Sequence, residues 1–213
     1  MDTSASWQTA AQVVPEVRAT DRRTRHRERR HQELYAAAVD LFVEQGFENT
    51  TMEQIAERAD VARATVFNHF ERKTAFLDEW MSQRRKRAFA AVREENLTDW
   101  SLDRILRRYM IESARMSEET RAETVALMTA TVHSTDLLAH PVLAEEFEPY
   151  IVEAQKSGEA PAEMKAGVAG LVVATSYFAV LSQWIAVDPA PFDLTTELLA
   201  MLDILLSGVL KRS

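Results

Sequence analysis

Residues that interrupt helices are scarce in this chain, which has five Gly and six Pro among 213 residues. Ala, Leu, Glu and Arg, which all favour helices, are frequent. Apolar side chains also return every three or four positions over most of the chain, which is the period of a helix with one buried face. The sequence therefore predicts an all-α fold, with enough length for one or two small domains.

Local signals indicate where the first helices begin and end. Gly46 follows an apolar stripe and is free to adopt positive φ, so it ends the first helix. Thr51 and Gln54 form a capping-box pattern that starts the second helix, and Asp60 tolerates the left-handed conformation that ends it. The predicted helices cover residues 27–45, 51–59, 62–70, 73–95, 101–116, 119–134, 141–157, 162–187 and 193–211.

Charge is distributed unevenly, and this divides the chain. The net charge is −8, yet residues 1–87 carry +1 and residues 88–213 carry −9. The less acidic N-terminal part is suited to meeting phosphates. We predict a disordered basic arm at residues 1–26, a helix-turn-helix DNA-binding domain at 27–75, and a helical effector-binding and dimerisation domain at 76–213.

Two short helices joined by a tight turn are typical of a helix-turn-helix, whose second helix enters the major groove of DNA. The polar face of that second helix offers groups that read base edges, because Arg pairs with guanine and Asn with adenine. The candidate residues are Arg63, Ala64, Thr65, Asn68 and His69. Thr51 and Lys73 lie at helix starts and are candidates for phosphate contacts. This spacing also occurs in ordinary helical bundles, so periodicity alone leaves that alternative open.

Residues from about 31 to 80 resemble the DNA-binding domain of TetR/AcrR-type repressors, and the matching string is LYAAAVDLFVEQGFENTTMEQIAERADVARATVFNHFERKTAFLDEW. The residues that match the family pattern are Phe42, Gly46, Phe47, Thr51, Ile55, Ala56, Val61, Thr65, His69, Phe70 and Lys73. Three positions depart from it: Asp60 replaces the usual Gly, Ala62 the usual Ser cap, and Phe67 a frequent Tyr. These departures affect the operator sequence that the chain would read rather than the mode of docking.

The resemblance implies that Arg63, Thr65, Phe67 and Asn68 approach bases, while Thr51, His69 and Lys73 hold the DNA backbone. For His69 the alternative is a histidine packed beside Phe70, and for Lys73 a solvated lysine at a helix start. The Arg-rich segment 22–30 is a further candidate for contact with phosphates or a minor groove, with a solvated tail as its alternative.

A single short recognition helix reads few base pairs, so we expect a homodimer that reads a palindrome. The last two helices are rich in apolar side chains, and the resemblance also implies dimerisation through the final two helices. The predicted interface residues are Leu171, Phe178, Leu181, Trp184, Leu198, Leu202 and Leu205. Packing within one chain is the alternative role for several of them.

The middle helices carry Met and aromatic residues that suit an adaptable, largely apolar effector pocket. The predicted pocket residues are Phe89, Tyr109, Met110, Met116, Met128 and His133. For each of these side chains a place in the core is the alternative. We predict no metal, because Cys is absent and His133 and His140 stand too far apart to share an ion without further ligands.

Residues 166–187 carry no charge, a length that could span a bilayer. Their small and polar residues favour a buried bundle or interface helix instead, so we expect no membrane partner. The N-terminus has no apolar signal-peptide segment, and we expect a cytoplasmic protein.

The sequence has no Gly-rich phosphate loop and no hydrolase or metalloprotease motif, so we predict neither enzymatic activity nor a cofactor. We predict a dimeric, ligand-responsive regulator, most simply a repressor that a small-molecule effector releases from its operator. An activator, and a helical interaction protein that has lost DNA reading, remain alternatives.

Overall fold

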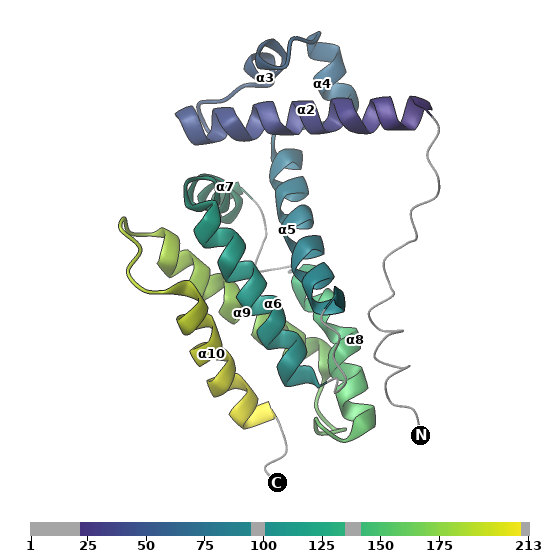
Figure 1. The fold of residues 1–213 in the computed structure, drawn as a ribbon, viewed down its shortest axis with the longest axis vertical. Helices are drawn as coiled ribbons and strands as arrows, with labels where there is room; N and C mark the ends of the chain where they lie inside the picture. Colours follow the sequence, from purple (N-terminus) through teal and green to yellow (C-terminus); the bar gives the residue numbers. More distant parts are fainter. Residues whose placement is uncertain (1–21, 95–100, 135–141, 210–213) are drawn as a thin grey trace. The chain divides into compact units, whose positions relative to one another are not determined.

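The computed structural model describes residues 22–94, 101–134 and 142–209, and every regular element among them is a helix. This confirms the predicted all-α fold. The helices are α2 (Arg22–Gln45), α3 (Met52–Arg58), α4 (Arg63–His69), α5 (Thr74–Glu94), α6 (Leu102–Glu119), α7 (Arg121–Ser134), α8 (Val142–Ser157), α9 (Ala166–Ile185) and α10 (Leu194–Val209) (Figure 1).

Packing divides these helices into two compact units. One, here called the HTH unit, comprises the described residues 22–83 and 120–134; the other, the bundle unit, comprises 84–119 and 142–209. The predicted boundary at residue 75 falls inside α5, whose residues are shared between the units, and α7 packs against α2 in the HTH unit. The three domains predicted from the sequence are defined by function, whereas the two units are defined by packing. The predicted domains therefore stay a prediction.

Helix α2 begins earlier than the sequence predicts. The predicted disordered arm lies outside the described residues up to residue 21, but residues 22–26 are helical. The prediction was wrong for these five residues because it required an apolar stripe, and this part of α2 has none. The end of α2 is as predicted: Gly46 has a φ of 87° and donates its N–H to the Phe42 carbonyl, with N and O 3.1 Å apart.

The capping box at the start of α3 is confirmed. The Gln54 N–H donates to Thr51 Oγ1 over 3.2 Å, and the Thr51 N–H donates to Gln54 Oε1 over 2.8 Å. Gln45 at the end of α2 also donates to Thr50 Oγ1 and Gln54 Oε1, each over 3.2 Å. These bonds satisfy backbone donors at the helix start and tie α3 to the end of α2.

An aromatic cluster forms the core of the HTH unit. The Phe70 ring, directly after α4, stacks on Phe76 of α5 with centroids 3.8 Å apart, and on His31 of α2 at 4.3 Å. Phe42 of α2 lies 5.0 Å from Phe47 and 6.1 Å from Phe76, again between ring centroids. Rings from two helices and two connecting segments thus fix the end of α4 relative to α2 and α5.

The bundle unit is held by contacts of α9 with α8 and α10 and of α10 with α6. Two of its helix starts are capped from a distance: Glu159 accepts the Leu102 N–H at α6 over 2.9 Å, and Glu118 accepts the Leu194 N–H at α10 over 3.2 Å. A carboxylate at a helix start also opposes the positive end of the helix dipole.

Helix α9 has two different faces. Gly170, Val173, Tyr177, Leu181 and Trp184 are among its buried residues, while the opposite side is largely exposed. Among the described residues it is the one helix long and apolar enough to cross a bilayer by length and composition. A core helix of a bundle passes the same test, and the packed face of α9 matches that interpretation.

The two glycines of α9 give a matched test of the α8–α9 contact. A Cβ on Gly170 would lie 2.6 Å from the backbone oxygen of Ala144, whereas one on Gly167 would meet only the Glu148 side chain at 3.5 Å. We expect Gly170→Ala to lower the free energy of unfolding by about 1–3 kcal/mol through overpacking. Gly167→Ala should raise it by up to about 1 kcal/mol through helix propensity. Thermal unfolding of both variants checks this, and equal melting temperatures would contradict the close α8–α9 approach.

Candidate nucleic-acid interface

A tight turn joins α3 to α4. Asp60 in this turn has a φ of 51°, the left-handed conformation predicted for it. The following N–H, that of Val61, donates back to the Ala56 carbonyl over 2.9 Å and closes the end of α3. Asp is among the few non-Gly residues that adopt this conformation at low cost, so the replacement of the family's Gly leaves the turn intact.

Helix α4 starts without a side-chain cap. Ala62 has the extended backbone of an N-cap residue, with φ −66° and ψ 143°, but its methyl group accepts no hydrogen bond. The helix has seven residues, and Val66 is its buried residue. Since an isolated helix of this length is unstable in water, the packing of Val66 and of Phe70 must hold α4 in place.

One side of α4 is open to solvent, as a helix that enters a DNA groove requires. Thr65 is half-buried, and the exposed residues of α4 are Arg63, Ala64, Phe67 and Asn68. The Arg63 guanidinium pairs with Glu53 of α3 over 2.8 Å and lies 5.2 Å from the Phe67 ring centroid. Sequence analysis missed this pairing of Arg63 with Glu53, because the two residues come together only once the turn has formed.

The Thr51 hydroxyl accepts a hydrogen bond in the capping box, so its own O–H remains available as a donor. Lys73 is placed differently from the prediction of a phosphate-binding or solvated lysine. Its Nζ lies 2.6 Å from the Phe47 carbonyl oxygen, 3.0 Å from that of Thr50 and 3.4 Å from that of Glu48. The three donors of the ammonium are thus matched by three acceptors, and Lys73 holds the α2–α3 turn against the start of α5.

His69, at the end of α4, is half-buried, and its ring centroid lies 5.7 Å from that of His31. Burial lowers the pKa of His69 below its usual value, and the nearby His31, Arg27 and Arg30 lower it further. This place beside the Phe70 cluster, with a lowered pKa, corresponds to the packing alternative. Its contact with DNA stays a prediction.

The predicted effector residues are distributed over both units, and most of them are buried. In the bundle unit, Phe89 and Tyr109 are buried in an aromatic cluster with Phe147, Tyr150 and Tyr177. Met110 and Met116 are also buried in this unit. Met128 and His133 belong to the HTH unit, where Met128 is buried and His133 is exposed. His140, considered with His133 for metal binding, lies outside the described residues.

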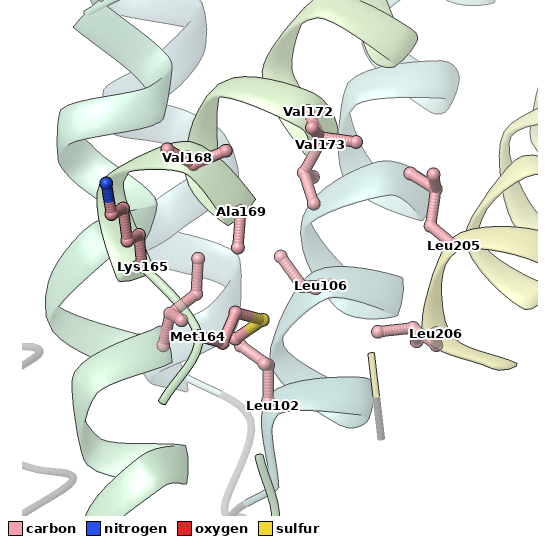
Figure 2. Close-up of a pocket in the computed structure, with 11 residues that line it drawn as sticks. Leu102, Leu106, Met164, Lys165, Val168, Ala169, Val172, Val173, Leu205 and Leu206 are labelled. Atoms are coloured by element: carbon pink, nitrogen blue, oxygen red, sulfur yellow. The ribbon is translucent and has the colours of Figure 1, made fainter. Parts of the chain in front are cut away.

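A cavity of about 360 Å³ instead opens in the bundle unit between α6, α8, α9 and α10. Figure 2 shows Leu102 and Leu106 of α6 facing Val173 of α9 and Leu205 of α10 across it, while the Lys165 amine points away. Its lining also includes Ile151, Met164, Val168, Ala169, Val172 and Leu206. The cavity is apolar, and its lining includes none of the six residues predicted to line an effector pocket. The location of the effector site stays a prediction.

Most of the predicted dimer residues are buried within one chain. Phe178, Leu181, Trp184, Leu198 and Leu202 are each at most 3% exposed. They already fill the core of the bundle unit, so they are not available to a second chain. The prediction failed for them because the spacing of apolar residues does not distinguish a core face from an interface. Leu205 is half-buried and Leu171 is 39% exposed.

Other apolar side chains on α9 and α10 are exposed. Val168 and Val172 are 54% and 43% exposed, and Ile204 is 74% exposed. Sequence analysis missed Ile204 as an interface residue. The sequence does contain an indication of this exposure. Leucines recur at 194, 198, 202 and 206, which are buried, and Ile204 lies outside that row.

The fold and the geometry of α3, the turn and α4 define a helix-turn-helix protein of the all-α class. The family model described as "Bacterial regulatory proteins, tetR family" matches residues 34–80. This match covers the region from α2 to α5 and agrees with the TetR/AcrR resemblance of the sequence there.

Curated relatives match over the same region. The chain is 40% identical over 53 residues to the "Probable acrEF/envCD operon repressor" of Escherichia coli K12, covering 24% of each protein. It is 45% identical over 51 residues to the regulator TcmR of Streptomyces glaucescens, covering 24% of this chain and 23% of that protein. The chain therefore spans about a quarter of the length of the curated relatives it matches.

Solved structures extend the likeness in fold to most of the chain. Thermus thermophilus FadR, a repressor in complex with lauroyl-CoA, is 24% identical with a TM-score of 0.66, over 86% of this chain and 96% of that one. SmeT, the repressor of a Stenotrophomonas maltophilia efflux pump, is 22% identical with a TM-score of 0.67, over 86% and 91%. At this identity the likeness establishes the fold alone.

The uncapped start of α4 gives a direct stability test. We expect Ala62→Ser to raise the free energy of unfolding by about 1 kcal/mol, because the hydroxyl would accept a backbone N–H of the first turn. Ala64→Ser, two residues further along α4, lacks the cap position and should be neutral or slightly destabilising. Denaturant unfolding compares the two variants. A stabilisation by Ala64→Ser as large as that by Ala62→Ser would contradict the assignment of Ala62 as N-cap.

Proposed function

We propose that this protein is a transcriptional repressor that binds a palindromic DNA operator as a homodimer in the cytoplasm and is released by a small apolar effector. The observation that carries the proposal is the exposed face of α4, which presents Arg63, Phe67 and Asn68 from a helix held at its buried side by Val66 and Phe70. A short, firmly packed helix with hydrogen-bonding side chains on its open side is suited to the major groove.

The side chains on this face match the chemistry of base edges. The Arg63 guanidinium can donate two hydrogen bonds to guanine, and the Asn68 amide can pair with adenine. Phe67 offers an apolar surface to a thymine methyl. Arg63 must leave Glu53 to reach a base, and since both side chains are more than half exposed, breaking that pair costs at most about 1 kcal/mol.

Dimerisation would use the open side of α9 and α10. Val168, Leu171, Val172 and Ile204 give these two helices an exposed apolar surface, and such surfaces mark interaction sites. Two recognition helices on a two-fold dimer would read two half-sites, which supplies the sequence length that one seven-residue helix lacks.

An effector would bind in the bundle unit. The apolar cavity lined by Leu102, Leu106 and Val173 suits a small hydrophobic molecule. The structural relatives FadR and SmeT are described with lauroyl-CoA and triclosan, respectively. Helix α5 contributes to both units and is the proposed route by which the bound effector alters DNA affinity. A coupling of about 1–3 kcal/mol, the usual range, would change that affinity about 5–150-fold.

The proposal that α4 contacts bases is tested with a DNA duplex that the full-length chain selects from a random-sequence library. We expect Arg63→Ala combined with Asn68→Ala to weaken binding to that duplex by about 1–3 kcal/mol per lost base contact. Binding to a duplex of unrelated sequence should change much less, because phosphate contacts remain. Fluorescence anisotropy with both duplexes measures this.

Arg104→Ala provides the control, since Arg104 is exposed on α6 in the bundle unit. It should leave both affinities near those of the wild type. Equal binding of the selected duplex by the double variant and the wild type would contradict the role of α4.

The dimer assignment is tested by placing a charge on the exposed surface of α10. Ile204→Glu should convert the dimer to a monomer of 24.2 kDa, because an unpaired carboxylate would be buried between the two chains. Val132→Glu on α7 is the matched control, as Val132 is 45% exposed and belongs to the HTH unit. Light scattering coupled to size exclusion gives the masses. A dimer that survives Ile204→Glu, or a monomeric wild type, would overturn this interface.

A further inference from the structure

The first two turns of α2 are basic on every side and make few contacts. The segment 22–30 reads RRTRHRERR and contains six Arg, one Glu and no apolar residue. Residues 22–29 are exposed along their whole length. In Figure 1 this part of α2 continues past the helices α3 and α4 that pack on the same helix. It therefore contributes nothing to the core of the HTH unit.

A helix with this composition is unfavourable by itself. A helix that is polar all round gains no burial, and no acidic residue occupies the first turn of α2. Arg22 and Arg23 instead stand at the positive end of the helix dipole, which disfavours cations and favours anions. An anionic partner would remove both penalties, since it would neutralise the arginines and complement the dipole.

The six arginines lie on two opposite sides of the helix. Arg23, Arg27 and Arg30 follow at intervals of four and three residues and continue the row that leads to the buried Leu34. Arg22, Arg25 and Arg29 lie on the other side.

The first group is the one on the side of α4. His31, which lies one turn after Arg27 and directly after Arg30 on α2, has its ring centroid 5.7 Å from that of His69 at the end of α4. Arg27 and Arg30 also lower the pKa of His69. A positive surface thus lies beside the end of the helix proposed to read bases.

Two arginines of this surface are available for a partner. Arg30 is paired with Glu33 over 2.9 Å, and Arg29 on the opposite side shares the same carboxylate over 3.0 Å. Within the described part of the chain, Arg23 and Arg27 form no ion pair. They are also only one turn apart, so both can meet one continuous anionic surface.

We infer that Arg23 and Arg27 bind the phosphate backbone of the DNA duplex next to the base pairs contacted by α4, so that the start of α2 is an additional DNA-contacting element. The inference rests on the proposed function, because it requires α4 to dock on DNA. Phosphates are the partner that fits the position of this surface: a duplex engaged by α4 would present a dense row of negative charges beside the helix end. Contacts of this kind strengthen binding without reading sequence.

Two double variants with the same loss of charge test the inference. Arg23→Gln with Arg27→Gln removes the pair on the α4 side, and Arg22→Gln with Arg25→Gln removes a pair on the opposite side. Affinity for a 30-base-pair duplex selected by the wild-type chain is measured by anisotropy between 50 and 200 mM KCl. Each lost phosphate contact lowers the slope of log affinity against log salt by about 0.9.

We expect the Arg23/Arg27 variant to lose about 3.6 units of slope, because each chain of the dimer loses two phosphate contacts. Over this fourfold salt range the variant should therefore lose roughly 150-fold less affinity than the wild type does. The Arg22/Arg25 variant should keep a slope close to that of the wild type, which separates a specific contact from the general effect of net charge. Circular dichroism controls for the helix content of both variants.

The outcomes separate this inference from the proposed function. Selection of a duplex by the wild type together with equal slopes for the two variants would overturn the inference and leave the function of α4 intact. Failure of the wild type to select or bind any duplex would overturn both. A change in oligomeric mass of the Arg23/Arg27 variant, with an unchanged salt slope, would assign the basic surface to an acidic region of a second chain instead and would also overturn the inference.

Discussion

The stacking of Phe70 between His31 and Phe76 is the interaction that holds the proposed recognition helix, α4, in place. Helix α4 has seven residues and no side-chain cap, so its own hydrogen bonds do not stabilise it in water. Ring contacts at 3.8 and 4.3 Å connect its end to α5 and α2, and Val66 anchors its middle. Because these contacts are all on the inner side, the outer side is left free for polar groups, and a rigid helix with an open polar face is what base recognition requires.

Features set by neighbours in the sequence were predictable, and those set by distant residues were not. Gly46, the Thr51–Gln54 capping box and the left-handed Asp60 follow from the conformational preferences of a few consecutive residues. Lys73, by contrast, donates to carbonyl groups 23–26 residues away, and no local pattern announces that contact. Helical periodicity likewise identified the apolar faces of α9 and α10. It could not show that most of those side chains are buried in the core of one chain while Ile204 is exposed, because that depends on how the helices pack.

The division of α9 into a packed and an open face relates the fold to the proposed regulation. Gly170 allows its packed side to approach the α8 backbone closely, and the open side carries Val168 and Val172, which also line the apolar cavity. An effector in that cavity and a second chain on that surface would therefore contact the same helix. Under the proposed function, this shared helix gives ligand binding a physical means of changing the geometry of the dimer, and hence the separation of its two α4 helices.

The central claim is that two α4 helices of a dimer enter the major groove of one duplex. Dimethyl sulfate protection on a duplex selected by the full-length chain tests it most directly, since the reagent methylates guanine N7 in the major groove and adenine N3 in the minor groove. The account predicts two clusters of protected guanines, with centres separated by about 10–10.5 base pairs or a multiple of that spacing. Protection of a single cluster, or of adenines in the minor groove without guanines in the major groove, would contradict it.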